Sequence, residues 1–287
     1  MRLGVVGFAS GDPRVVTADE LRKAVKLGVT SVCYHGSGDI LGEITSSDCD
    51  RANDLYDDLG LELAQFGIGY GECLFDPDKT VRDKVVRTIC RGIEVGCSLR
   101  AHNVLIRTGS LNPSGSYDPT PENHEPGSLE MLINTLTRIA EKADKEGVTV
   151  VVETHALTIM GSPEINKQVI DEVGSAQLRV VMDFVNHFQS LEQVYNSTER
   201  LNHIFEVMGS ISTVAHIKDI SLAPGFVLHM NEEVPGSGVL DLVTALRCWE
   251  ELHPGGYMLV EHLPEEKIPI AVQNVRQIAA KAGVSIV

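Results

Sequence analysis

Eight short apolar runs recur along the chain, and each is followed by a longer amphipathic stretch. The runs cover residues 2–8, 29–34, 61–67, 103–107, 148–153, 178–183, 212–217 and 256–261. Because nearly all their residues are apolar, we expect parallel strands that are covered on both faces. Helical patterns cover residues 17–28, 46–60, 78–96, 128–146, 163–174, 189–209, 239–251 and 266–282. Eight strand–helix units predict one α/β domain over residues 1–287, a (β/α)8 TIM barrel.

The alternative fold is an open, doubly wound sheet. Such a sheet usually has fewer units and a glycine-rich first turn, and neither feature is present in the sequence. Residues typical of helix ends support the predicted boundaries. Asp78 and Ser128 stand where helix N-caps are expected, and Gly96, Gly147 and Gly174 stand where helices are expected to end.

The charge balance restricts the partners that such a chain can bind. Forty acidic residues against 24 basic ones give a formal net charge of -16, which disfavours nucleic acids and anionic membranes. The N-terminal residues resemble a first strand and lack a signal-peptide pattern, so we expect a cytoplasmic protein. The six cysteines show no C-x-x-C spacing, which favours free thiols over a zinc–thiolate site. A small-molecule substrate is the expected partner.

Four consecutive predicted strands end in residues that can bind a metal ion: Glu153, Asp183, His216 and Glu261. The carboxyl ends of barrel strands meet at one mouth, so these four side chains are expected to surround one point. Three carboxylates packed so closely need a cation. Hard oxygens with one nitrogen suit a divalent metal, which we expect to be Mn²⁺, with Mg²⁺, Co²⁺ and Zn²⁺ as alternatives. The long segments 108–127 and 218–238 are expected to open onto the same mouth.

The strand endings VVVETH, VMDFVNHF, VAHIKD and MLVEHL, with the turn Pro235-Gly236-Ser237-Gly238, resemble the sugar phosphate isomerase/epimerase superfamily of xylose-isomerase-like TIM barrels. Within it, the chain resembles the ketose 3-epimerases. The resemblance implies a metal-dependent sugar isomerase or epimerase. Glu153 would remove the proton next to a carbonyl, and Glu261 would return one to the opposite face of a metal-stabilised enediolate. It also implies a homodimer or a homotetramer.

Three positions depart from the ketose 3-epimerase pattern. Asn186 stands where a histidine usually contacts the substrate, and Lys218 and Asp219 also differ. The same metal frame serves lyases, dehydratases, decarboxylases and C-glycoside-cleaving enzymes, so one of these acting on an oxidised sugar or sugar acid is the alternative function. The abasic-site nucleases of this fold are disfavoured because they need a basic groove. A non-catalytic barrel is disfavoured because binding alone does not need two flanking glutamates.

Six further residues are predicted to contact the substrate: His35, Arg107, His155, Asn186, His187 and Lys218. For His35, Arg107, His155 and Lys218 a simpler structural reading is also open. Lys218 could instead pair with Asp219 at the surface, and Arg107 could pair with a carboxylate at the mouth. The turn at 235–238 could hold a phosphate at a helix N-terminus, but a tight glycine turn is the preferred interpretation. Strand alternation is expected to turn His262 away from the metal.

Overall fold

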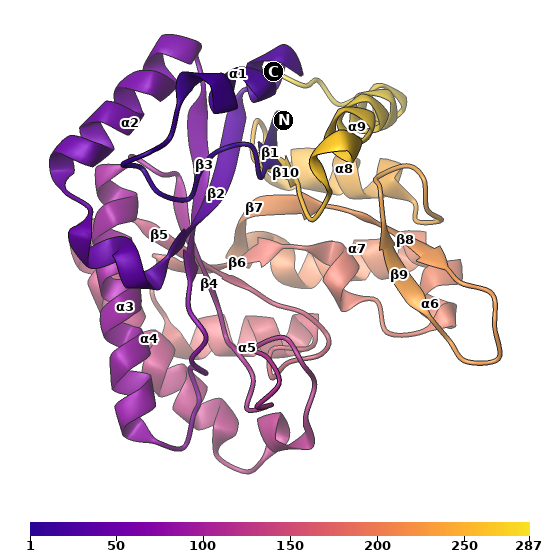
Figure 1. Cartoon of the computed structure of the whole chain (residues 1–287). Helices are drawn as coiled ribbons and strands as arrows, with labels where there is room; N and C mark the ends of the chain where they lie inside the picture. The colour runs from indigo at the N-terminus through magenta and orange to yellow at the C-terminus, as the bar shows by residue number, and fades with distance from the viewer.

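Eight parallel strands close into a barrel in the order β1-β10-β7-β6-β5-β4-β3-β2 (Figure 1). The computed structural model describes all residues, 1–287. The barrel strands are β1 (Arg2–Val6), β2 (Ser31–Ser37), β3 (Glu62–Gly69), β4 (Asn103–Arg107), β5 (Thr149–Glu153), β6 (Leu178–Met182), β7 (Ser212–Ile217) and β10 (Tyr257–Val260). All eight predicted strands are therefore present, and the predicted (β/α)8 barrel is confirmed.

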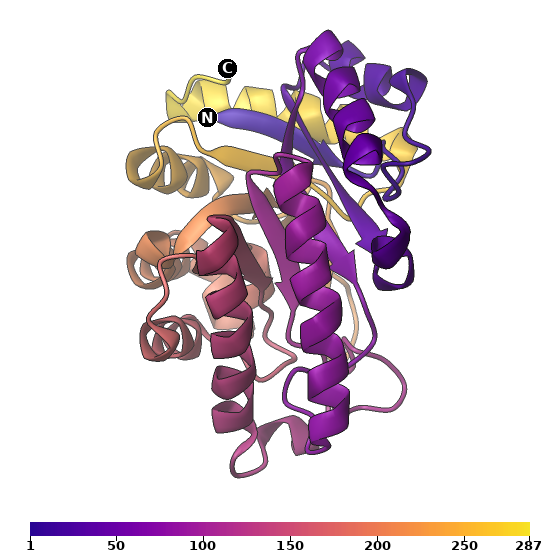
Figure 2. The same ribbon diagram turned by 90° about the vertical axis from the view of Figure 1, so that its left-hand side faces the viewer.

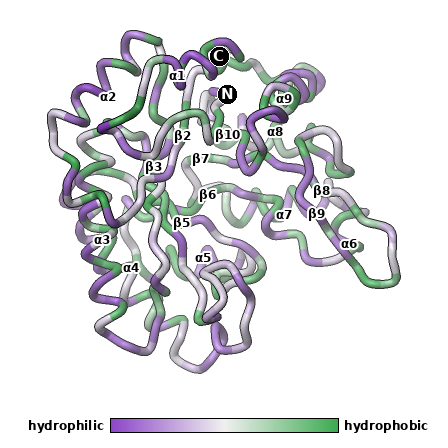
Figure 3. Tube along the Cα trace, in the orientation of Figure 1, coloured by the Kyte–Doolittle hydropathy of each residue, from purple (hydrophilic) through white to green (hydrophobic).

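Helices surround the barrel, and their apolar faces pack against the strands (Figure 2). They are α1 (Ala18–Lys26), α2 (Ser46–Leu59), α3 (Lys79–Ser98), α4 (Ser128–Glu146), α5 (Pro163–Val173), α6 (Leu191–Tyr195), α7 (Ser197–Met208), α8 (Leu242–Leu252) and α9 (Ile268–Ala282). Hydrophilic and hydrophobic stretches alternate along these helices, as expected when one face is solvated (Figure 3). None of them combines the length and apolar character that crossing a bilayer requires.

Several predicted helix boundaries are confirmed and others are wrong. Asp78 caps α3, and Gly147 and Gly174 end α4 and α5 in the left-handed conformation. Ser128 is the first residue of α4, and Gly127 is its cap. Gly96 lies inside α3 because the helix runs close to β4 there: a Cβ atom at this position would lie 2.4 Å from Val104. Close packing, and not helix termination, explains this glycine.

Two further departures concern the second half of the chain. The stretch predicted as one helix over residues 189–209 is two helices, α6 and α7, which meet at Asn196. The long segment 218–238 contains an unpredicted antiparallel hairpin of β8 (Asp219–Leu222) and β9 (Met230–Glu233), which projects beside the barrel in Figure 1. Its strands pair with each other and not with the barrel.

Candidate metal centre

The alternation of side chains along the strands determines which residues reach the mouth of the barrel. The inside of the barrel is filled by eight packed side chains: Cys33, Ala64, Leu105, Val151, Val181, Val214, Tyr257 and Leu259. Residues two positions apart face the same side of a strand. The positions two residues after Val151, Val181, Val214 and Leu259 are Glu153, Asp183, His216 and Glu261. The packing of the core below therefore directs these four side chains into the mouth.

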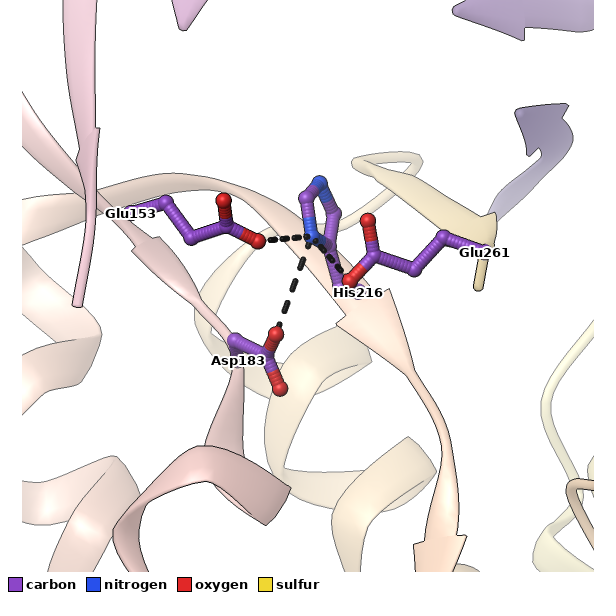
Figure 4. Close-up of side chains that lie close together, drawn as sticks. All are labelled: Glu153, Asp183, His216 and Glu261. Carbon is purple, nitrogen blue, oxygen red and sulfur yellow. Dashed lines mark ion pairs between the residues drawn. The ribbon is translucent and has the colours of Figure 1, made fainter. Parts of the chain in front are cut away.

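The four side chains converge on one point, as Figure 4 shows. One ligand atom from each lies within 4.8 Å of the others. Nδ1 of His216 lies 2.9 Å from Glu261 Oε1, 3.7 Å from Glu153 Oε1 and 3.8 Å from Asp183 Oδ2. All four residues are buried, with at most 4% of their surface exposed.

Each of these four residues has one buried polar atom without a hydrogen-bond partner. In His216 and Glu261 these atoms are the Nδ1–Oε1 pair, which is close in distance but lacks hydrogen-bond geometry. Unpartnered buried carboxylate oxygens are costly, and a bound cation would satisfy them together. The donor set of three carboxylates and one imidazole fits a divalent metal ion.

Gln65 on β3 fixes the orientation of the imidazole, and the sequence analysis did not identify it. Its Oε1 lies 3.1 Å from Nε2 of His216 and also accepts from the Cys33 thiol at 3.4 Å. Because an amide oxygen only accepts, the proton of the neutral imidazole resides on Nε2. The lone pair of Nδ1 then faces the three carboxylates, as a metal ligand requires. A glutamine within the apolar run of residues 61–67 was the available signal.

Two cations accompany the carboxylates: Lys218 is buried and Arg107 is partly buried. Nε of Arg107 donates to Glu153 Oε2 at 2.8 Å, which is the salt bridge considered from the sequence. Nζ of Lys218 donates to Asp183 Oδ2 at 2.6 Å and lies 2.8 Å from Glu261 Oε1. Lys218 is 1% exposed, so the surface pair with Asp219 suggested as its simpler reading is wrong.

These contacts shift the pKa values of the cluster in opposite directions. Burial opposes a charge on His216, but without a metal the facing carboxylates raise its pKa well above the ordinary value, so the ring is protonated. Burial and the Glu261 charge raise the pKa of Glu153, but this imidazolium and Arg107 outweigh them and hold it below its ordinary range. Burial also opposes the charge of Glu261, yet His216 and Lys218 bring its pKa well below the usual value. Burial disfavours the Lys218 ammonium, but the facing carboxylates of Asp183 and Glu261 raise its pKa well above the ordinary value. All four groups are therefore held in their charged forms.

Asp219 has a structural role in the turn at residues 235–238. Its carboxylate accepts backbone hydrogen bonds from Gly236, Gly238 and Leu240 at 3.0–3.1 Å, and from Ile220 at 2.8 Å. The amides that could have held a phosphate are thus bound to a side chain of the same chain. This arrangement agrees with a tight glycine turn.

A cavity of about 410 Å³ opens onto the cluster at Glu153. His155 and Asn186, predicted as substrate contacts, line it. His187 does not: it is fully buried, and its Nε2 lies 3.1 Å from Thr154 Oγ1. His35 lies beneath the mouth, with Nε2 3.1 Å from Nη2 of Arg107, and burial lowers its pKa to about 4. The placement of His187 and His35 does not support direct substrate contact.

Of the lining residues that were not predicted from the sequence as substrate contacts, three have polar side-chain atoms. Tyr117 comes from the long segment after β4, and Glu232 comes from the hairpin. His262 also lines the cavity, contrary to the expectation from strand alternation, because its backbone is in the left-handed conformation (φ 53°). Nδ1 of His262 lies 3.2 Å from Glu232 Oε2. No sequence period predicts a reversal of backbone conformation directly after a strand.

A family model described as xylose isomerase-like TIM barrel matches residues 21–278. The chain belongs to this family. No curated protein matches the sequence.

Several solved structures share the fold at low sequence identity. A 3-keto-D-glucoside 4-epimerase from E. coli superposes with a TM-score of 0.73 at 16% identity, over 96% of this chain and 99% of that one. A D-psicose 3-epimerase from Clostridium cellulolyticum H10 gives 0.74 at 13%, over 99% and 100%. A xylose isomerase-like barrel from Mycobacterium smegmatis in complex with magnesium gives 0.72 at 16%, over 98% and 96%. At such identities the likeness establishes the fold of this family member.

Proposed function

We propose that this member of the family is a divalent-metal-dependent sugar isomerase or epimerase. The observation that carries the proposal is the convergence of Glu153 and Glu261 on one buried centre from opposite sides. They extend from the ends of β5 and β10, which are separated in the barrel by β6 and β7. Figure 4 shows the two carboxylates on either side of His216. Two carboxylates that flank a substrate carbon can act on its two faces, as inversion of a centre requires.

The metal would be held by Glu153, Asp183, His216 and Glu261. Mn²⁺ is the proposed ion, and the magnesium complex of a structural relative makes Mg²⁺ the first alternative. A divalent cation at this point would supply electrostatic stabilisation of the negative charge that develops on substrate oxygens.

The side chains of this protein divide the proton transfers between them. Arg107 donates to Glu153 Oε2 and favours the ionised carboxylate, so Glu153 is the proposed base. Glu261 would return a proton to the opposite face of the same carbon. Each positioned acid or base is typically worth about 10²–10⁴-fold in rate.

The alternative reaction, elimination or decarboxylation of a sugar acid, depended on Arg107 and Lys218 as binding sites for a carboxylate. Both cations are already paired with carboxylates of the protein. The contacts therefore favour isomerisation or epimerisation of a neutral sugar. The cytoplasmic location and the homodimer or homotetramer remain predictions.

The test is NMR of keto sugars and keto sugar acids incubated with the Mn²⁺-loaded protein in deuterium oxide. Epimerisation or isomerisation places deuterium on a retained carbon, whereas elimination gives a new double bond or a shorter product. Glu153→Gln should abolish turnover with a nearly unchanged thermal transition, because the side chains have the same shape. Glu141→Gln, on the exposed face of α4, is the control and should retain turnover. Near-normal turnover of Glu153→Gln contradicts the proposal.

A further inference from the structure

The cavity above the metal cluster has two unlike parts. Seven of its twelve lining residues are apolar: Tyr117, Ala156, Leu157, Val185, Phe188, Ile220 and Met230. Glu153, His155, Asn186, Glu232 and His262 provide the polar groups. We call the seven apolar residues the apolar wall. Because Glu153 lines the same cavity, a molecule that fills the cavity would contact both the cluster and the apolar wall.

The apolar wall is poorly suited to the hydroxyl groups of a simple sugar. A hydroxyl moved from water to a site without a hydrogen-bond partner loses free energy. Leu157, Val185, Ile220 and Met230 offer neither a donor nor an acceptor in their side chains. The cavity has a volume of about 410 Å³. It lies in the range of about 300–1,000 Å³ found for drug-sized ligands.

Tyr117 contributes an aromatic ring to the apolar wall, and two neighbouring side chains fix the position of this ring. Its ring stacks on His155 with centroids 5.9 Å apart and an angle of 30° between the planes. The guanidinium carbon of Arg107 lies 5.4 Å from the centre of the same ring. The tyrosine is nevertheless 48% exposed, so its ring still has surface to offer a ligand. An aromatic or aliphatic group of a ligand can pack there at a small cost in side-chain entropy.

We propose that the substrate is a keto sugar that carries an apolar substituent, such as a glycoside with an apolar aglycone and a keto group on the sugar ring, and not a bare monosaccharide. The sugar oxygens would face the metal cluster, and the substituent would lie on the apolar wall. This inference rests on the proposed function for the orientation of the sugar. The wall itself, and its preference for an apolar group, are independent of the reaction.

Binding of two simple glycosides to the full chain tests the preference without requiring turnover. Phenyl β-D-glucoside and methyl β-D-glucoside differ only in the substituent, and their affinities can be compared by titration calorimetry of the Mn²⁺-loaded protein. Burial of a phenyl-sized group is expected to tighten binding about tenfold to a hundredfold. Equal affinities, including no measurable binding of either glycoside, overturn the proposal.

Two variants in the β8–β9 hairpin test whether the apolar wall causes the preference for the phenyl glycoside. Met230→Gln places a polar side chain of similar length in the wall and should reduce the preference for the phenyl glycoside at least threefold. Leu228→Gln changes a residue that is 47% exposed and does not line the cavity, so it should retain the preference. An unchanged preference in Met230→Gln, or an equal loss in both variants, overturns the assigned wall. A phenyl preference, together with no deuterium incorporation into any of the keto sugars tested above, would instead contradict the proposed function alone.

Discussion

Replacement of Lys218 by methionine tests whether the protein balances its acidic cluster with a built-in cation. Without a metal, three carboxylates face Arg107, Lys218 and the protonated His216, so the charges of the cluster balance. The Lys218→Met substitution leaves one uncompensated negative charge at a site that is almost entirely buried. Methionine retains most of the length and the apolar stem of lysine, so the change is mainly one of charge.

The magnitude follows from the distances. Two unit charges 2.6 Å apart, the Lys218–Asp183 separation, interact by about 6 kcal/mol at an effective dielectric constant of about 20. Because desolvation opposes part of this attraction, removal of one partner of a buried pair typically costs about 3–5 kcal/mol. We expect the free energy of unfolding to fall by that amount without metal. Saturating Mn²⁺ should reduce the loss, because a divalent cation compensates the same carboxylates.

Urea unfolding in EDTA and in saturating Mn²⁺ provides the measurement. Lys79→Met is the matched control, because Lys79 makes an ion pair of the same 2.6 Å length with Asp83 on the exposed surface. Solvent screens that pair, so the control should unfold almost as the parent protein does. If Lys218→Met is as stable as Lys79→Met in EDTA, or gains nothing more from Mn²⁺ than the parent does, the electrostatic reasoning is wrong.

Two further predictions concern stability. Burial lowers the pKa of His187 from 6.5 to about 4, so the neutral form stabilises the fold above pH 6.5, and up to about 3 kcal/mol is lost as the pH falls towards 4. His187→Gln should lack this part of the acid sensitivity in urea unfolding at several pH values, and a parallel pH profile would contradict the assignment. Gly238→Ala should cost about 1–3 kcal/mol, because its Cβ would lie 2.3 Å from the Ile220 carbonyl oxygen and 2.4 Å from Asp219 Oδ1. Gly42→Ala is the control, because a Cβ atom at this position would have no atom within 4 Å. Equal urea-unfolding midpoints for the two variants would refute the steric argument.

The fold was predictable because its strands are buried on both faces and their apolar runs are interrupted only at their ends. Those interruptions also revealed the cluster, since a carboxylate directly after an apolar run, as at Glu153 and Glu261, has to lie at the edge of the core. Helix ends were less predictable. Gly96 is of the residue type that often ends a helix, and the sequence analysis therefore placed a helix end there. A glycine is required at this position because α3 and β4 approach closely, and sequence periodicity does not encode that approach.

The walls of the site were harder to predict than its centre. Lys218 lies two residues after His216, so alternation placed it in the mouth, but its choice of Asp183 and Glu261 over its neighbour Asp219 depends on contacts between strands. His262 reaches the cavity through one backbone reversal. Met230 and Glu232 belong to the β8–β9 hairpin. Its strands are too short for the alternation of apolar and polar residues to be recognised within a polar segment.

The hairpin of β8 and β9 shapes the cavity, whereas the barrel strands position the acidic cluster. It contributes Ile220, Met230 and Glu232 to the cavity, yet its strands pair only with each other, and the carboxylate of Asp219 fastens its base to the following turn. A change in the length or composition of this insert would reshape what the pocket accepts while the barrel and its acidic centre retain their geometry. Ligand preference in this protein can therefore diverge by exchange of a small peripheral module, without redesign of the catalytic frame.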